Sequence, residues 1–403
     1  MRLLHSADWQ LGCRFAQFGE KAGALRKARL KTLRRTLELA KQRTVDAFVI
    51  AGDLFDDSQV DEAVVTATLE IFASFPEIKV FILPGNHDPY VGPGSVWNRK
   101  SFVGAPQHVH VFRQTEVVEL DGGFLLASPL QQKKSTLDPS LKLDELAKKL
   151  PREKIQVGIT HGSLAIPSQH GHSAFPVALD AATRAGLDYL ALGDWHNWQI
   201  YDNGRLVMPG TPEQDSFEQT GAGFIAHVIL GEKGSIPQVE QVPVGQFQWH
   251  TFDIDYLNFE SARALLQQAV AGLSGKADSS VIRVRVRGSA AREVRLPTSQ
   301  WLNELLKPFP ISQLHDESSL SLSPAELEHL KANHPILAQV LGDLDQIAAF
   351  TIGLKNENAT AEPLSPKQVD ELLEAARIEK ANLTAAHFEL ARQMLLQKLQ
   401  EAK

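Results

Sequence analysis

The clearest fold signal in the sequence is Val80-Phe81-Ile82-Leu83-Pro84-Gly85-Asn86-His87-Asp88. Four apolar residues lead directly into a polar motif. A short apolar run of this kind is typical of a buried strand. The pattern therefore predicts a strand that leaves the protein core and presents polar side chains at its carboxyl end.

The same pattern recurs four more times in the first 210 residues. Apolar runs lead to Asp8, to Gly52-Asp53, to Thr160-His161-Gly162 and to Gly193-Asp194-Trp195-His196. Helical periodicity separates the early strands, at about residues 22–43 and 62–72. This alternation predicts βαβ units, in which ligands gather at the carboxyl ends of the strands. Five polar motifs should therefore converge on one site.

The residue types in these motifs indicate metal binding. Carboxylates, amides and imidazoles together suit a pair of divalent cations. Two cations about 3.5–4 Å apart can activate a water and stabilise both oxygens of a phosphoryl transfer. The polar residues at the strand ends are Asp8, Gln10, Asp53, Asn86, His87, His161, Asp194 and His196.

Composition limits the class of protein. The chain has 403 residues, which at roughly 150 residues per domain predicts two or three domains. Hydrophobic residues make up 43% and charged residues 22%, as in ordinary globular proteins. The net charge of -7 excludes nucleic-acid binding driven by total charge, although not a local basic patch.

The cysteine content and the N-terminus indicate a cytoplasmic protein. Cys13 is the only cysteine, so a disulfide within the chain is excluded, which suits a reducing cytosol. The first residues are too polar for a signal peptide. There is no run of about 18 apolar residues, so we expect no membrane span.

Taken in order, the motifs D-x-Q, G-D-x-x-D, G-N-H-D, T-H-G and G-D-x-H resemble the signature of the calcineurin-like metallophosphoesterases. The opening HSADWQLG at residues 5–12 and the long spacing to THG resemble the DNA-repair exonuclease branch, which contains SbcD-type nuclease subunits. The resemblance covers roughly residues 1–215. It implies an α/β sandwich of two central sheets flanked by helices, with metal-dependent phosphodiester hydrolase activity.

The resemblance also implies ligand roles. Asp8 and His196 would hold a first metal ion. Asn86 and His161 would hold a second, and Asp53 would bridge the two.

The remaining residues of the central motifs would assist the reaction. His87 would lie beside the scissile phosphate and protonate the leaving oxygen or stabilise the transition state. Asp88 would orient that imidazole, and Asp56 would orient its neighbours rather than bind metal.

Two positions depart from the family pattern, and each replaces an imidazole by an oxygen donor. Gln10 stands in a motif that is commonly D-x-H, and it could bind a metal through its amide oxygen or not at all. Asp194 stands where the family commonly has histidine and adds a negative charge beside the second metal. Because harder ligands favour harder cations, we expect Mn²⁺ as the preferred ion, with Mg²⁺ or iron as alternatives.

Changes in the residue pattern along the chain predict two domains and a tail. Residues 1–250 would form the metallophosphoesterase (nuclease) domain. Residues 251–354, with alternating strand and helix patterns, would form a small α+β domain. The resemblance implies that such a domain caps the site and helps to hold DNA. Residues 355–403 would form a linker and a helical tail that binds a partner.

Arginines in the second part suggest a contact with nucleic acid. Period-two alternation places Arg283, Arg285 and Arg287 on one face of a strand, where they could contact phosphates. The alternative is cross-strand pairing with Asp253 and Asp255, which also alternate.

The tail suggests a protein partner. Residues 367–400 are amphipathic, and the resemblance implies binding to an SbcC-like SMC-type ATPase and a homodimer. No G-x-x-x-x-G-K-[ST] loop is present, so ATP hydrolysis must come from another chain.

The sequence therefore favours a DNA exonuclease or endonuclease subunit in DNA repair. One alternative is a phosphodiesterase for a small molecule such as a cyclic nucleotide, because the same motifs serve that chemistry. Another is a catalytically weak DNA-binding scaffold, in which the altered ligands no longer support turnover. Retention of both Asp53 and His87 argues against the scaffold.

Overall fold

The computed structural model describes residues 1–166, 174–321, 328–329, 332–333, 335–352, 365–375, 387–388 and 391. Within it, the chain divides into two compact units. The first is Met1–His250 with Asp278–Val281, and the second is Thr251–Ala277 with Ile282–Lys403.

The first unit contains a six-stranded sheet in the order β12-β11-β1-β2-β3-β4. The four strands β1 to β4 are parallel, as βαβ connections require, and β11 and β12 add an antiparallel edge. The strands are β1 (Arg2–Ser6), β2 (Ala47–Ala51), β3 (Val80–Leu83), β4 (Val109–Val111), β11 (Phe224–Ile229) and β12 (Gln238–Pro243).

A second six-stranded sheet follows the order β5-β6-β7-β8-β10-β9. Its four inner strands β6, β7, β8 and β10 are parallel to one another, and β5 and β9 pair antiparallel at its two edges. The strands are β5 (Glu116–Leu120), β6 (Gly123–Ser128), β7 (Ile155–His161), β8 (Tyr189–Gly193), β9 (Gln199–Tyr201) and β10 (Leu206–Met208).

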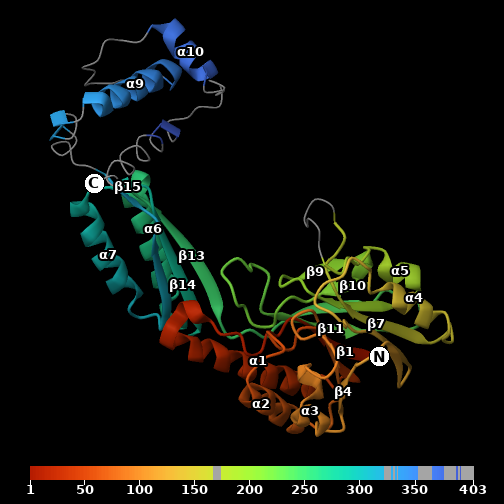
Figure 1. Ribbon diagram of the computed structural model, residues 1–403. Helices are drawn as coiled ribbons and strands as arrows, with labels where there is room; N and C mark the ends of the chain where they lie inside the picture. Colours follow the sequence, from red (N-terminus) through yellow and green to blue (C-terminus); the bar gives the residue numbers. More distant parts are fainter. Residues whose placement is uncertain are drawn as a thin grey trace. The chain divides into compact units, whose positions relative to one another are not determined.

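The two sheets pack face to face and are covered by helices on their outer faces. Between the sheets lies one apolar cluster that includes Val49 and Val157. A second apolar cluster, outside the first sheet, contains Leu33 and Phe72. Figure 1 shows α1, α2 and α3 on one side of the unit and α4 and α5 on the other, where a third cluster lies. The helices are α1 (Ala22–Gln42), α2 (Glu62–Ala73), α3 (Lys100–Val103), α4 (Leu141–Ala147) and α5 (Ala181–Ala185), with short 3₁₀ turns η1 (Ala16–Lys21), η2 (Val96–Asn98) and η3 (Asp202–Gly204). This is the expected sandwich.

The second unit contains most of a three-stranded sheet in the order β13-β14-β16, with a two-stranded sheet of β15 and β17. Ile282, Val284 and Val286 face the core of this unit, as their period-two spacing predicts. The elements are β13 (Gln248–Asp255), η4 (Tyr256–Asn258), α6 (Phe259–Gly272), η5 (Ser274–Ser279), β14 (Ser280–Arg287), β15 (Ser289–Ala290), α7 (Arg292–Leu306), β16 (Ile311–Asp316) and β17 (Ser319–Leu320).

Two further helices, α9 (Pro335–Ile352) and α10 (Pro366–Ala375), belong to the same unit in the chain. α10 coincides with the start of the predicted tail helix, whereas most of residues 376–400 and nearly all of the predicted linker lie outside the described residues. None of the helices in the described ranges is both long enough and apolar enough to cross a bilayer.

Candidate metal centre

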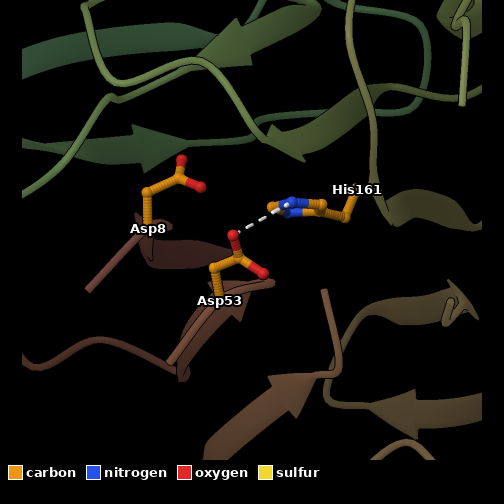
Figure 2. A group of neighbouring side chains, drawn as sticks. All are labelled: Asp8, Asp53 and His161. Carbon is orange, nitrogen blue, oxygen red and sulfur yellow. Dashed lines mark ion pairs between the residues drawn. The ribbon is translucent and has the colours of Figure 1, made fainter. Parts of the chain in front are cut away.

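The strand ends of the two sheets bring the motif residues together. Asp8 follows β1 and Asp53 follows β2, whereas His161 is the last residue of β7 in the other sheet. Each of these three side chains offers a ligand atom, and the three atoms lie within 4.8 Å of one another. All three side chains are buried, and Figure 2 shows them pointing into a common space. Such a cluster suits a cation held by oxygen and nitrogen.

Asp53 is the centre of this cluster. Its Oδ1 accepts the backbone N–H of His87 at 2.9 Å, and its Oδ2 accepts Nε2 of Gln10 at 2.9 Å. Nε2 of His161 lies 3.6 Å from the same Oδ2, along the dashed line in Figure 2. Asp53 thus contacts residues from three of the five motifs.

The ring of His161 is held with Nε2 toward the centre. Nδ1 lies 2.8 Å from the carbonyl oxygen of Ala51, which can only accept, so Nδ1 is protonated and donates to it. Nε2 lies 2.7 Å from Oδ1 of Asn86 and 3.7 Å from Oδ1 of Asp194. A backbone carbonyl behind one ring nitrogen is the usual way to orient a metal-binding histidine.

Negative charge is concentrated at this point of the structure. Burial and the neighbouring carboxylates of Asp53 and Asp194 raise the pKa of Asp8 to about 6. Burial opposes the charged form of His161, yet the nearby carboxylates, Asp53 first among them, raise the pKa of that imidazole to about 9. A divalent cation would relieve the repulsion between these carboxylates.

Gln10 presents an acceptor with no partner. Only its NH₂ group can donate to Asp53, so the amide oxygen must face the other way. That Oε1 is buried and accepts no hydrogen bond from the described residues. A buried acceptor without a donor is costly, and a cation would satisfy it. The side chain therefore fits the role of an oxygen ligand.

Asp194 and His196 occupy the end of the last motif. The backbone N–H of Asp194 donates to both oxygens of Asp8, at 3.1 Å each, and its carboxylate accepts the hydroxyl of Ser163. Nδ1 of His196 lies 2.6 Å from Nε2 of Gln219 and 3.5 Å from Oδ2 of Asp215. Burial opposes the charged form of His196, but Asp215 raises the pKa of His196 to about 9.

Asp215 and Gln219 were missed by the sequence analysis. They lie between β10 and β11, in a segment that matches none of the five motifs. No spacing or composition signal in the chain distinguishes them from other polar loop residues.

His87 is the exposed member of the group. Its side chain is 45% exposed, and Nε2 lies 4.0 Å from Oδ2 of Asp53. Nδ1 lies 2.8 Å from the carbonyl oxygen of Asp56. Burial lowers the pKa of His87, but Asp53 and Asp56 outweigh it, so the pKa is raised. The ring is thus oriented beside the cluster and accessible to a substrate.

The expected orienting role of Asp88 is wrong. Its two oxygens accept the backbone amides of Phe55 and Gly85, at 2.9 and 2.8 Å. These buried amides need an acceptor, which the carboxylate supplies, and no hydrogen bond joins it to the ring of His87 among the described residues. Asp56 orients that ring through its main-chain carbonyl. Asp88 instead holds two motif loops together.

The backbone at the site is strained. Asp8 and Asp53 each have φ of 53°, Gln10 has φ of 45° and Asp194 has φ of 108°. Left-handed backbone at residues other than glycine costs about 1–3 kcal/mol each and clusters at functional sites.

Two glycines allow the loops to approach. A Cβ on Gly52 would lie 2.0 Å from Nδ1 of His161. A Cβ on Gly85 would lie 2.1 Å from Oδ1 of Asp53. No larger residue fits at either position without moving a side chain of the cluster.

Two of the three arginines in the predicted stripe, Arg285 and Arg287, are paired with acids. Arg285 donates to both oxygens of Asp253, at 2.7 and 2.9 Å, which is the cross-strand alternative. Arg287 pairs with Glu317 at 3.1 Å, and Asp255 accepts the backbone amide of Leu257 instead. For these two arginines the structure therefore favours pairing within the protein over contact with phosphates.

Comparisons with known proteins point to the metallophosphoesterases, which is consistent with a metal site. A family model described as calcineurin-like phosphoesterase matches residues 1–198. The uncharacterized metallophosphoesterase YhaO of Bacillus subtilis strain 168 is 22% identical over 410 residues, which cover 94% of this chain and 96% of that protein. The D subunit of nuclease SbcCD from Escherichia coli K12 is 24% identical over 282 residues, covering 61% of this chain and 69% of that protein.

Among solved structures, TT1561 of Thermus thermophilus aligns with a TM-score of 0.41 at 10% identity, covering 60% of this chain and 98% of that chain. The family match carries the assignment, and it coincides with the part of the chain that supplies the cluster. Residues 1–198 of this chain are a calcineurin-like metallophosphoesterase domain, and the protein is a metal-dependent phosphoesterase.

Proposed function

We propose that the protein is a nuclease subunit that hydrolyses phosphodiester bonds of DNA. The observation that carries this proposal is the similarity to the D subunit of nuclease SbcCD, which covers 61% of the chain. The motifs support the chemistry, because Asp8, Asp53 and His161 follow or end strands and lie together, with Asn86 and Asp194 beside His161. Linear DNA with accessible ends is the proposed substrate, and DNA repair is the proposed setting.

The donor set fits a pair of divalent cations. When bound, the cations would supply an activated water and stabilise the attacking and leaving oxygens. The oxygen-rich donors favour Mn²⁺, with Mg²⁺ or iron as alternatives. In this assignment Asp8, Gln10 and His196 would hold one cation and Asn86, His161 and Asp194 the other, and Asp53 would be shared between them.

His87 would act on the substrate rather than on a cation. Its ring is partly exposed and oriented by Asp56, so a phosphodiester above the cluster could reach Nε2. From that position the imidazole would donate a proton or hydrogen bond to the leaving oxygen.

The remaining assignments are proposals as well. Residues 1–250 would be the nuclease domain, residues 251–354 a capping and DNA-binding domain, and residues 355–403 a linker with a partner-binding tail. The partner would be an SbcC-like SMC-type ATPase, and two copies of this chain would form a dimer. The proposed location is the cytoplasm, because a single cysteine suits a reducing compartment.

One observation favours a second candidate function. Arg285 and Arg287 are paired with acids, so this stripe gives little support for a polymeric substrate. A phosphodiesterase that acts on a small diester, such as a cyclic nucleotide, needs no such surface.

Hydrolysis assays with Mn²⁺ distinguish the two functions. Purified protein is incubated with end-labelled linear DNA and, separately, with a small diester, beside a His87→Ala variant. DNA cleavage by the wild type that the variant loses supports the nuclease. Cleavage of the small diester alone, also when the SMC-type ATPase is added, favours the second candidate. Cleavage of neither substrate contradicts both.

A further inference from the structure

Arg29 of α1 joins two segments of the chain that lie beside proposed metal ligands. Its Nη1 donates to the carbonyl oxygen of Trp9, the residue between Asp8 and Gln10, at 2.5 Å. Its Nη2 lies 3.2 Å from Oδ2 of Asp215, in the segment that follows β10. The two nitrogens of one guanidinium group therefore contact the loop after β1, in the first sheet, and a segment that follows a strand of the second sheet.

The loop after β1 needs such a contact, because its backbone is strained. Asp8 has φ of 53° and Gln10 has φ of 45°, so two residues other than glycine adopt the left-handed region on either side of Trp9. Conformations of this kind persist only where the surrounding structure fixes them. The hydrogen bond from Arg29 fixes the peptide group that joins Trp9 to Gln10, and with it the course of the loop that carries both proposed ligands.

The segment after β10 lies against His196, the proposed ligand from the second sheet. The backbone amide of Thr211 donates to the carbonyl oxygen of His196 at 3.1 Å. Oδ2 of Asp215 lies 3.5 Å from Nδ1 of the same histidine. Arg29 therefore connects, through one contact on each side, the surroundings of the ligands that two different sheets would contribute to one cation.

Packing alone does not explain an arginine at this position. The side chain of Arg29 is 1% exposed, and its Nε has no hydrogen-bond partner among the described residues. Its guanidinium also lies over the ring of Phe15, 5.3 Å from the centroid. Replacing a buried ion pair by apolar side chains of similar volume is often neutral or stabilising, so an apolar pair in place of Arg29 and Asp215 would serve the core equally well. What an apolar pair would not supply is the link between the two segments.

We propose that Arg29 is a positioning residue for the cation assigned to Asp8, Gln10 and His196, because it sets the separation between the ligands that follow β1 and the ligand that follows β8. Both arms of its guanidinium are needed, one for the carbonyl of Trp9 and one for the segment after β10. The inference rests on the proposed ligand assignment, and it adds a residue of α1 that lies outside the five motifs.

Arg29→Lys tests this role in a protein that keeps the positive charge beside Asp215. A lysine offers one nitrogen in place of the two arms of arginine, so it should not hold both segments. Mn²⁺ is titrated into the full-length protein without substrate, and the bound ions are counted by calorimetry and electron paramagnetic resonance. We expect one of the two sites to weaken by about 10–100-fold, as on loss of an outer partner of metal ligands. Wild-type affinity at both sites overturns the proposal.

Thr32→Val is the matched control, from the next turn of α1. The hydroxyl of Thr32 donates to Oε2 of Glu213 at 2.7 Å, so the variant removes a buried contact between α1 and the same segment after β10. Glu213 retains the backbone amides of Gln246 and Phe247, at 2.8 and 2.9 Å. We therefore expect lower stability in urea denaturation but wild-type affinity for both ions. An equal loss of Mn²⁺ affinity in Thr32→Val and Arg29→Lys overturns the proposal, since any weakened contact with α1 would then have the same effect.

Hydrogen exchange gives a readout without any metal. The backbone amide of Gln10 donates to the carbonyl oxygen of Asp53 at 3.1 Å. In metal-free Arg29→Lys this amide should exchange faster, relative to the amides of β1 and β2, than in the wild type or in Thr32→Val, because the loop after β1 should open locally more often. Unchanged relative exchange of Gln10 in Arg29→Lys overturns the proposal.

The inference and the proposed function can fail separately. Absence of Mn²⁺ binding to the wild-type protein contradicts the proposed function, and the exchange of the Gln10 amide then decides the role of Arg29 alone. If the wild type binds two ions and cleaves DNA while Arg29→Lys matches it at both sites, only the role of Arg29 is overturned. Thermal unfolding of each variant confirms that it is folded.

Discussion

The carboxylate of Asp53 accepts a hydrogen bond from the backbone amide of His87 at 2.9 Å. One side chain thus holds the loop after β3 against the loop after β2, while its other oxygen faces Gln10 and His161. Asp53, which is proposed to contact both cations, therefore also positions His87, the proposed catalytic residue.

Replacing Asp53 should therefore remove more than one function. In Asp53→Ala we expect loss of both bound Mn²⁺ ions and of turnover, because the shared ligand and the loop contact disappear together. Calorimetric titration counts the ions. Asp57→Ala is the control, since Asp57 lies in the same loop but its side chain is 50% exposed. Two tightly bound ions in Asp53→Ala would contradict the shared role.

His87→Ala should separate binding from chemistry. The ring of His87 lies 2.8 Å from the carbonyl oxygen of Asp56 and 4.0 Å from Oδ2 of Asp53, and it is not among the proposed ligands, so both Mn²⁺ ions should remain bound. Loss of a general acid should slow turnover by about 10²–10⁴-fold. The kcat of the variant is compared with that of His110→Ala, whose ring pairs with Glu116. Near-normal turnover in His87→Ala would sink the assignment.

Gly85→Ala should damage the centre through a single methyl group. The added Cβ would lie 2.1 Å from Oδ1 of Asp53, so the carboxylate or the loop must move. We expect weaker Mn²⁺ binding and lost activity in a protein that still folds. Gly94→Ala is the matched control, since a Cβ there has no atom within 4 Å. Equal Mn²⁺ affinity in the two variants is the contrary result.

Arg29→Met should destabilise the fold. The side chain of Arg29 is 1% exposed and that of Asp215 is 14% exposed. Removing Arg29 leaves the carboxylate of Asp215 without its positively charged partner. Breaking a buried ion pair in this way costs about 3–5 kcal/mol of unfolding free energy. Urea denaturation measures it, and Arg35→Met on the exposed face of α1 should change stability by less than about 0.5 kcal/mol. A similarly small loss in Arg29→Met would show that the contact is unimportant.

His5 should make stability depend on pH. Burial lowers the pKa of His5 from 6.5 to about 3, as expected for a packed core residue beside Tyr189. Below pH 6.5 the unfolded chain binds a proton that the folded chain does not, so stability falls with pH toward about 3. The slope from this group is at most about 1.4 kcal/mol per pH unit.

A variant isolates that contribution. His5→Asn cannot titrate but can still contact the hydroxyl of Tyr189. Between about pH 7 and about pH 5 its unfolding free energy should fall less steeply than that of the wild type. Urea denaturation at several pH values compares the two slopes. Parallel curves would mean that His5 does not carry the effect.

Much of the centre could be predicted from local sequence. Each motif follows an apolar run, and parallel strands bring their carboxyl ends to one edge, so Asp8, Asp53 and His161 meet although they are far apart in the chain. The alternation of apolar runs with helical periodicity likewise predicted the α/β fold and the helices between the early strands. Asp88 shows the limit, because its carboxylate binds the amides of Phe55 and Gly85, while the adjacent ring of His87 is oriented by Asp56.

The contacts around the motifs were decided by the tertiary structure. Asp215 meets His196 because the segment after β10 packs against α1, where Arg29 supplies the opposite charge. Arg285 faces Asp253 because β13 and β14 are neighbours in the sheet. Strand period and polarity are local properties of the chain, so the amino-acid pattern was enough to predict which residues end the strands. The charged loop residue that contacts each proposed ligand is set by packing between segments remote in sequence. The spacing of the motifs carries no information about that packing.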